Sequence, residues 1–387
     1  MISRGIATFG LDTGKCPRWL FERMVRLGRE MVRIIVEEYS PEEFVARIAD
    51  PVWFQSLGTV LAFDWNASGL TTILTAALKE SVRGNENNLG IYICGGKGAT
   101  SLKTPDELQN WGERLSLPEP DTKNLIYNSK MSAKVDSSLV QDGFQLYHHA
   151  FFFTAHKNKI GSWTVVQQGM NQIKGTARRY HWHSAKITDL VCEPHTGITN
   201  PTRVPTLDLS AKTSSDTRKV STELVQGNYQ SLMSDIRIIR KHSSALSQMI
   251  SLKRGNQQLT LLNLENKEFK YHPVVNDDFN KSKYLEKILW LACERKPQNY
   301  EKLLSLEGVG PKTMRALSLV SEVIYGAKPS YEDPARYSFA HGGKDGTPYP
   351  VDRPTYDKTI SFFRQIIPKT RLPFSEKRKM MERLRST

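Results

Sequence analysis

The chain has 387 residues, more than one hydrophobic core usually serves, and its 54 Lys and Arg residues outnumber its 40 Asp and Glu residues to give a net charge of +14. No apolar run approaches the roughly 20 residues of a membrane-spanning helix, and the four cysteines lack the Cys-x-x-Cys spacing of a zinc site or redox pair. We therefore expect a cytoplasmic protein of two or three domains with no membrane segment, whose basic surplus favours a polyanionic partner.

The first 140 residues are predicted to form a mixed α/β domain. Apolar residues recur at three- and four-residue intervals after Pro17 and indicate an amphipathic helix to about residue 34. A strand is expected over residues 59–64, followed by a helix that Ser68 caps and that runs to about residue 82. A second strand is expected over residues 89–94.

Residues 141–215 are predicted to form a β-rich region that ends in a linker. Strands over residues 145–154 and 162–168 should form a hairpin around a polar turn that begins at Lys157. Because side chains alternate along a strand, His148 and His149 must lie on opposite faces. The stretch 194–216 is rich in Thr, Ser and Pro, which is typical of a loop.

Residues 216–387 are predicted to form a helical domain. A long helix is expected over residues 216–242, further helices from residue 281 onward, and a short basic helix from Phe374 to the end of the chain. Together the three regions predict an α+β fold.

Six of the nine histidines fall between residues 148 and 195, which makes this region a candidate active site. Imidazole is suited to proton transfer near neutral pH, and His149 and His181 are the candidate catalytic residues. The guanidinium groups of this region, with the stacking surfaces of Tyr180 and Trp182, suit a single-stranded or flipped-out base. We expect nucleic-acid contacts from this set: Gln167, Gln168, Arg178 and Arg179. The histidine spacings match no common metal-binding pattern, so no metal ligand is assigned.

The sharpest local signal runs from Leu306 to Thr313, where an apolar helix meets Gly-Val-Gly and a second helix opens with Pro. Glycine allows a tight reversal and close approach of a ligand to the backbone, and the N–H groups that open a helix attract phosphate. We expect this segment to bind nucleic acid through the following residues: Gly308, Val309, Gly310, Lys312 and Thr313.

This segment resembles the helix-hairpin-helix motif of DNA repair and recombination proteins, which holds phosphates without reading sequence. In the glycosylase branch of that superfamily, a Lys at the place of Lys312 forms a Schiff base with the sugar and an Asp downstream assists. Asp333 lies 21 residues after Lys312 and is the candidate for that role. Lys312 as a phosphate clamp and Lys312 as a nucleophile are therefore both open.

A third alternative concerns Gly95, Gly96 and Lys97, which follow a predicted strand and are expected to form an anion-binding loop. Asp64 and Lys97 at neighbouring strand ends would fit a Mg²⁺-dependent nuclease. No cofactor is expected otherwise.

The predicted function is DNA binding, with RNA as a second ligand, coupled to repair-type processing in which base excision is favoured over strand cleavage. A non-catalytic adaptor is the remaining alternative, and the sequence identifies no protein partner.

Across nearly its whole length the chain resembles family 763 of the domains of unknown function, found in archaea and bacteria. The resemblance implies no established activity. The segments that carry it are residues 10–20, 91–98, 163–170, the hairpin segment and 333–346.

Overall fold

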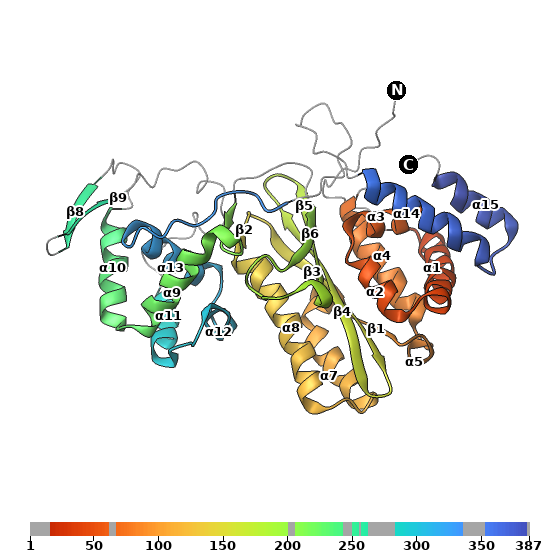
Figure 1. Cartoon of the computed structure of the whole chain (residues 1–387), viewed down its shortest axis with the longest axis horizontal. Helices are drawn as coiled ribbons and strands as arrows, with labels where there is room; N and C mark the ends of the chain where they lie inside the picture. The colour runs from red at the N-terminus through yellow and green to blue at the C-terminus, as the bar shows by residue number, and fades with distance from the viewer. Residues whose placement is uncertain are drawn as a thin grey trace, which may run out of the picture.

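A five-stranded antiparallel sheet forms the centre of the protein (Figure 1). The computed structural model describes residues 16–61, 67–199, 206–242, 250–254, 257–261, 283–335 and 353–384. The strands lie in the order β1, β3, β4, β5, β6. Their bounds are Ile91–Lys97 for β1, Gln145–His156 for β3, Lys159–Asn171 for β4, Thr176–His183 for β5 and His195–Thr199 for β6.

The hairpin predicted in the middle of the chain is confirmed as β3 and β4. Its two turn residues, Lys157 and Asn158, have φ values of 46° and 62°, the left-handed conformation that a tight hairpin turn demands. Alternation along β3 also places His148 and His149 on opposite faces, because His148 contacts Thr75 of one helix layer and His149 contacts Ser129 of the other.

Helices from both ends of the chain build a core on one face of the sheet. The N-terminal helices are α1 (Arg18–Glu38), α2 (Pro41–Ile48), α3 (Pro51–Val60) and α4 (Ala67–Val82), and the C-terminal ones are α14 (Arg353–Ile366) and α15 (Phe374–Arg383). Apolar side chains of these helices form one core with Ile93, Phe152 and Val166 of the sheet.

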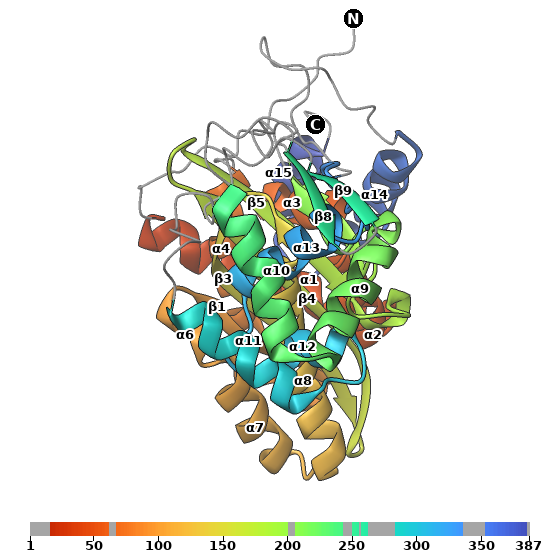
Figure 2. The same ribbon diagram turned by 90° about the vertical axis from the view of Figure 1, so that its left-hand side faces the viewer.

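The other face carries a second core, built on Phe151, Val165 and Trp182. Its helices next to the sheet are α7 (Thr104–Arg114) and α8 (Glu119–Ser138). A helical bundle packs outside α8 (Figure 2) and contains α9 (Ser215–Gln226), α10 (Tyr229–His242), α11 (Lys283–Arg295), α12 (Tyr300–Ser305) and α13 (Pro311–Val323). The fold is therefore α+β, as predicted, with helices on both faces of one antiparallel sheet.

The remaining α-helices and strands of the described chain are short. They are α5 (Glu86–Leu89), α6 (Ala99–Leu102), the strand pair β2 (Val140–Gln141) and β7 (Leu207–Asp208), and the pair β8 (Ile250–Arg254) and β9 (Gln257–Leu261). In the described part of the chain, every helix is too short or too polar to cross a membrane.

Four local predictions are wrong. Residues 59 and 60 end helix α3 instead of beginning a strand, because Asp50 caps that helix and its apolar residues pack in the first core. The helix expected over residues 216–242 is interrupted at Gly227 and becomes α9 and α10. The expected loop after residue 194 contains edge strand β6, whose pairing with β5 outweighs its low strand propensity. Ser68 lies inside α4, and Asp64 falls outside the described residues.

The boundaries expected at residues 140 and 215 do not separate independent cores. Strand β1 belongs to the first expected domain but pairs along its length with β3 of the second. Helices α14 and α15 belong to the third, yet they pack on α3 in the core formed by the N-terminal helices. The three expected regions therefore share one sheet and its two flanking cores.

Candidate functional site

The turn between α12 and α13 occupies the place where the sequence predicts a phosphate-binding hairpin. Asn299 caps α12 by accepting a hydrogen bond from the backbone N of Lys302 at 2.8 Å. Pro311 then begins α13 directly after Gly310, a position where its missing N–H costs nothing. Both predicted helices are present, and the buried Leu303 and Leu317 anchor them in the second core.

The two glycines of this turn have different surroundings. Gly308 has a φ of +78°, and a Cβ added there would lie 2.3 Å from Cδ1 of Ile288 on α11. Glycine is thus needed at residue 308 for the fold itself. A Cβ at Gly310 would meet no atom within 4 Å, so this backbone position faces open space beside the first turn of α13.

The remaining predicted contact residues of the hairpin divide between core and surface. Val309 and Thr313 are each 3% exposed, so their side chains support the turn from inside. Lys312 is only partly buried. No side chain caps α13, although the opening N–H groups of a helix attract negative charge.

Helix α8 joins the hairpin to the sheet. Lys134 Nζ donates to the backbone oxygens of Leu304 at 2.7 Å and Leu306 at 2.5 Å, and so satisfies carbonyl groups at the end of α12. Gln141 Nε2 donates to the backbone oxygen of Pro311 at 3.0 Å. Burial lowers the pKa of Lys134, although Glu307 opposes this shift. The hairpin is therefore held on both sides of its turn.

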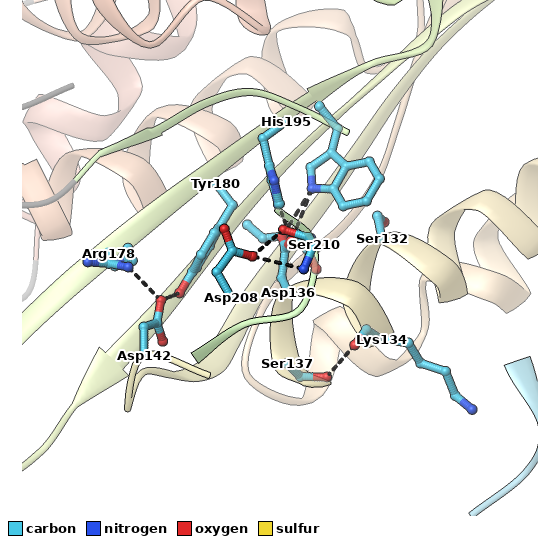
Figure 3. A network of polar contacts seen from close by, with 12 residues as sticks. Ser132, Lys134, Asp136, Ser137, Asp142, Arg178, Tyr180, His195, Asp208 and Ser210 are labelled. Carbon is cyan, nitrogen blue, oxygen red and sulfur yellow. Dashed lines mark hydrogen bonds and ion pairs between the residues drawn. The ribbon is translucent and has the colours of Figure 1, made fainter. Parts of the chain in front are cut away.

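The same helix carries the centre of a buried polar network (Figure 3). Asp136 is fully buried and accepts hydrogen bonds from Gln167 Nε2 at 2.5 Å, Trp182 Nε1 at 3.1 Å and His195 Nε2 at 2.5 Å. Burial raises the pKa of Asp136, and His195 acts in the opposite direction. Because a carboxylate accepts hydrogen bonds, Nε2–H of His195 is the donor in this contact, and it fixes the orientation of the imidazole ring beside Trp182.

His149 belongs to this network but both of its ring nitrogens are engaged. Nδ1 lies 2.9 Å from Gln167 Oε1, and Nε2 lies 2.9 Å from Ser129 Oγ. Because Gln167 uses its amide N–H on Asp136, its oxygen accepts from Nδ1–H of His149. Burial lowers the pKa of His149 to about 4, so the ring is neutral at physiological pH. The contacts of His149 orient Gln167.

Arg178 forms a second buried centre, between two carboxylates. Its guanidinium lies 2.8 Å from Asp142 and 2.6 Å from Asp333, and Tyr180 donates to Asp142 at 2.7 Å. Burial works against the charge, but the two carboxylates hold the pKa of Arg178 above its ordinary value. The second oxygen of Asp333 accepts from the backbone N of Ala335 at 2.9 Å. Arg178 thus fixes the chain beyond α13 to strand β5.

The opposite face of the sheet carries the other half of the predicted site. His148, Gln168 and Arg179 are direct neighbours across β3, β4 and β5, under the polar side of α4. Gln168 donates to the backbone oxygen of Ser68 at 2.8 Å, and Arg179 contacts Thr71 Oγ1 at 3.2 Å. Burial, aided by neighbouring positive charge, lowers the pKa of His148 to about 3.

His181 lies two residues along β5 on this second face. Its Nδ1 lies 3.0 Å from the backbone oxygen of Ile48, and burial with the charge of Arg179 holds its pKa well below the ordinary value. His181 and His149 were predicted to serve one site. They contact opposite helix layers, so the sheet separates them.

The expected anion loop is differently arranged. The backbone N–H of Gly95 donates to Glu107 at 2.7 Å, and that of Gly98 donates to the backbone oxygen of Tyr147 at 2.7 Å. Gly96 lies within the β1–β3 ladder, and Lys97 is exposed, with its ammonium 5.9 Å from the Tyr147 ring centroid. Protein acceptors therefore use the amide of Gly95, which the sequence assigns to an anion, and the amide of Gly98 next to the predicted loop.

The structure brings together part of the predicted set and adds residues that the sequence did not single out. His149 and Gln167 meet on the α8 face, where Arg178 and Asp333 also pair. Asp136 is the main addition. It lies near the end of a predominantly polar helix, away from the acidic residues of the first turn, and no spacing rule marks it. His195 was visible as a member of the histidine cluster, but its pairing with Asp136 depends on edge strand β6, which was expected to be a loop.

Comparison with known proteins gives a family but no activity. No curated protein and no solved structure matches the chain. The model of one protein family, described as "Protein of unknown function (DUF763)", matches residues 5–351. Since the match spans most of the sequence, the chain belongs to this family.

Proposed function

We propose that this protein binds the phosphate backbone of DNA, without reading base sequence, through the hairpin of residues 306–313. The observation that supports this most directly is the open space at Gly310, which lets a phosphate approach the uncapped start of α13. Lys312, in the first turn of that helix, adds positive charge. Gly308, packed on Ile288, supplies the backbone reversal that sets this geometry.

The net positive charge of the chain also favours DNA as the ligand. The surplus of 14 cationic residues favours association with a polyanion, because each cation that neutralises a phosphate releases condensed counterions. RNA presents the same phosphate groups and is the second ligand to test. A hairpin that contacts phosphates alone positions a duplex and carries no direct information on base sequence.

The geometry supports binding better than base excision at Lys312. The carboxylate expected to assist a Schiff-base reaction is Asp333, and its two oxygens accept from Arg178 and from the backbone N of Ala335. This carboxylate is held in a buried ion pair, which favours a role in fixing the chain beyond α13. Lys312 is then a phosphate clamp, and its charge is the property that matters.

Gly310→Val tests the binding site without disturbing the fold. Its φ of −150° suits any residue, and its Cβ would meet open space, so the variant should keep the wild-type free energy of unfolding. We expect its affinity for a labelled duplex, measured by fluorescence anisotropy, to fall about tenfold. The matched control is Gly227→Val between α9 and α10, where the added Cβ meets only ordinary contacts. Equal affinity of the two variants would contradict the assignment.

Lys312→Arg distinguishes two roles of Lys312, a phosphate-binding cation and a nucleophile. Arginine keeps the charge but cannot form a Schiff base, so a clamp predicts near wild-type binding and no borohydride-dependent covalent complex with DNA that contains abasic sites. A covalent complex that forms with the wild type and disappears in Lys312→Arg would identify a lyase instead. Lys312→Gln should weaken binding under both alternatives and confirms that the residue contacts DNA.

A further inference from the structure

A second basic surface lies far from the hairpin, where the start of α1 packs beside α15. Figure 1 shows these helices on the opposite side of the sheet from α12 and α13. Residues 18–26 and 374–383 place seven cationic side chains against three carboxylates on this surface, which we call the α1–α15 surface. The cations are Arg18, Arg23, Arg26, Lys377, Arg378, Lys379 and Arg383, and the carboxylates are Glu22, Glu376 and Glu382.

A shallow groove of about 190 Å³ runs between the two helices. Its walls combine the basic residues Arg23, Lys379 and Arg383 with Trp19, whose side chain is 64% exposed. Glu376 joins the helices through Arg26 at 2.5 Å, so the groove is part of the packed fold. Its volume is below the several hundred Å³ typical of an enclosed small-molecule site. The groove therefore suits a chain that passes over it and inserts one planar group.

Exposed aromatic rings are the unusual feature of this surface. Phe374, the first residue of α15, is 80% exposed, so two large aromatic residues stand in water among cationic groups. Exposed rings within a positively charged groove are the elements with which proteins hold single-stranded nucleic acid, since bases stack on the rings and cations follow the backbone. A duplex keeps its bases stacked inside and cannot use the rings in this way.

We propose that the α1–α15 surface binds single-stranded nucleic acid, with a base stacked on Trp19 and the backbone following Lys379 and Arg383. A membrane surface fits less well, because Met380 of α15 and Leu384 directly after it are buried in the core, and among the described residues of this surface Trp19 and Phe374 are the large apolar side chains left exposed. This site is separate from the hairpin, so an experiment can contradict one of the two proposals and support the other.

The test measures single-strand binding with a labelled oligothymidine of about 20 nucleotides, longer than the 4–16 nucleotides that such grooves cover. Trp19→Ala should weaken binding about tenfold, as expected for the loss of one stacked base. Lys379→Gln should weaken binding and reduce its salt dependence. The matched controls are Trp290→Ala, at a tryptophan 49% exposed on α11, and Lys103→Gln, at an exposed lysine after α6, and both should bind as the wild type does.

Two results would overturn this assignment. One is equal single-strand affinity in Trp19→Ala and Trp290→Ala. The other is tight binding to vesicles of anionic lipid that excess oligothymidine does not displace. Gly310→Val distinguishes the two proposals, because it should lose duplex affinity and keep oligothymidine affinity, whereas Trp19→Ala should show the reverse.

Discussion

Replacing Arg178 with Met tests whether the buried ion-pair centre holds the chain beyond α13 to the sheet. The guanidinium is fully buried and contacts Asp142 at 2.8 Å and Asp333 at 2.6 Å, with both carboxylates at most 2% exposed. Met fills similar space but leaves two buried carboxylates without their cation. Breaking one buried pair in this way costs about 3–5 kcal/mol, a large part of the roughly 5–15 kcal/mol that stabilises a typical domain.

Urea unfolding of Arg178→Met, followed by circular dichroism, measures this loss. Burial already raises the pKa of Asp142, and removal of the cation should raise it further. A buried carboxyl with a raised pKa destabilises the fold at pH values where it is ionised. The loss in free energy of unfolding caused by Arg178→Met should therefore become smaller as the pH falls from about 8 to about 5. Adding Asp142→Asn and Asp333→Asn should restore most of the stability. A loss below about 1 kcal/mol, or no recovery in the triple variant, would refute this reasoning.

Two further predictions concern stability. Burial lowers the pKa of His149 from 6.5 to about 4. The neutral ring therefore contributes fully to the free energy of unfolding above about pH 6.5, and this contribution is lost as the pH falls toward 4. His149→Gln removes this titration, so its free energy of unfolding should fall by about 2 kcal/mol less than that of the wild type when the pH is lowered from about 7.5 to about 5. Urea unfolding at both pH values measures the two losses, and equal losses would contradict the prediction. Gly308→Ala should destabilise by more than 1 kcal/mol because its Cβ meets Ile288, whereas Gly326→Ala, also at positive φ but in open space, should cost less; thermal unfolding compares the two.

Local signals predicted the β3–β4 hairpin and several helices because the determinants of these elements are close in sequence. The turn at Lys157 and Asn158, the amphipathic spacing after Pro17 and the glycines around Val309 each specify one element. Alternation along β3 likewise separated His148 from His149. The same rule predicted less about the site, since it assigns a face only to residues on one strand. Whether His181 shares a face with His149 depends on the register between strands.

Long-range pairing explains what the sequence could not predict. Edge strand β6 is polar and Gly-containing, and it is a strand because β5 offers a free edge. Its placement brings His195 to Asp136 of α8, a contact across 59 residues. The common core of α3 and α14 joins segments about 300 residues apart. Periodicity along the sequence does not encode such contacts. The sequence therefore predicts three separate domains, whereas in the structure these regions share cores.

The salt dependence of duplex binding tests the central claim most directly. If the hairpin holds phosphates, the affinity for unrelated duplexes of equal length should be nearly the same, and it should fall about tenfold or more between about 50 mM and about 200 mM salt as two or more counterions are released. Fluorescence anisotropy of two labelled duplexes that differ only in base sequence gives both results. Affinity that does not change with salt, or that differs tenfold or more between the two sequences, would contradict the account.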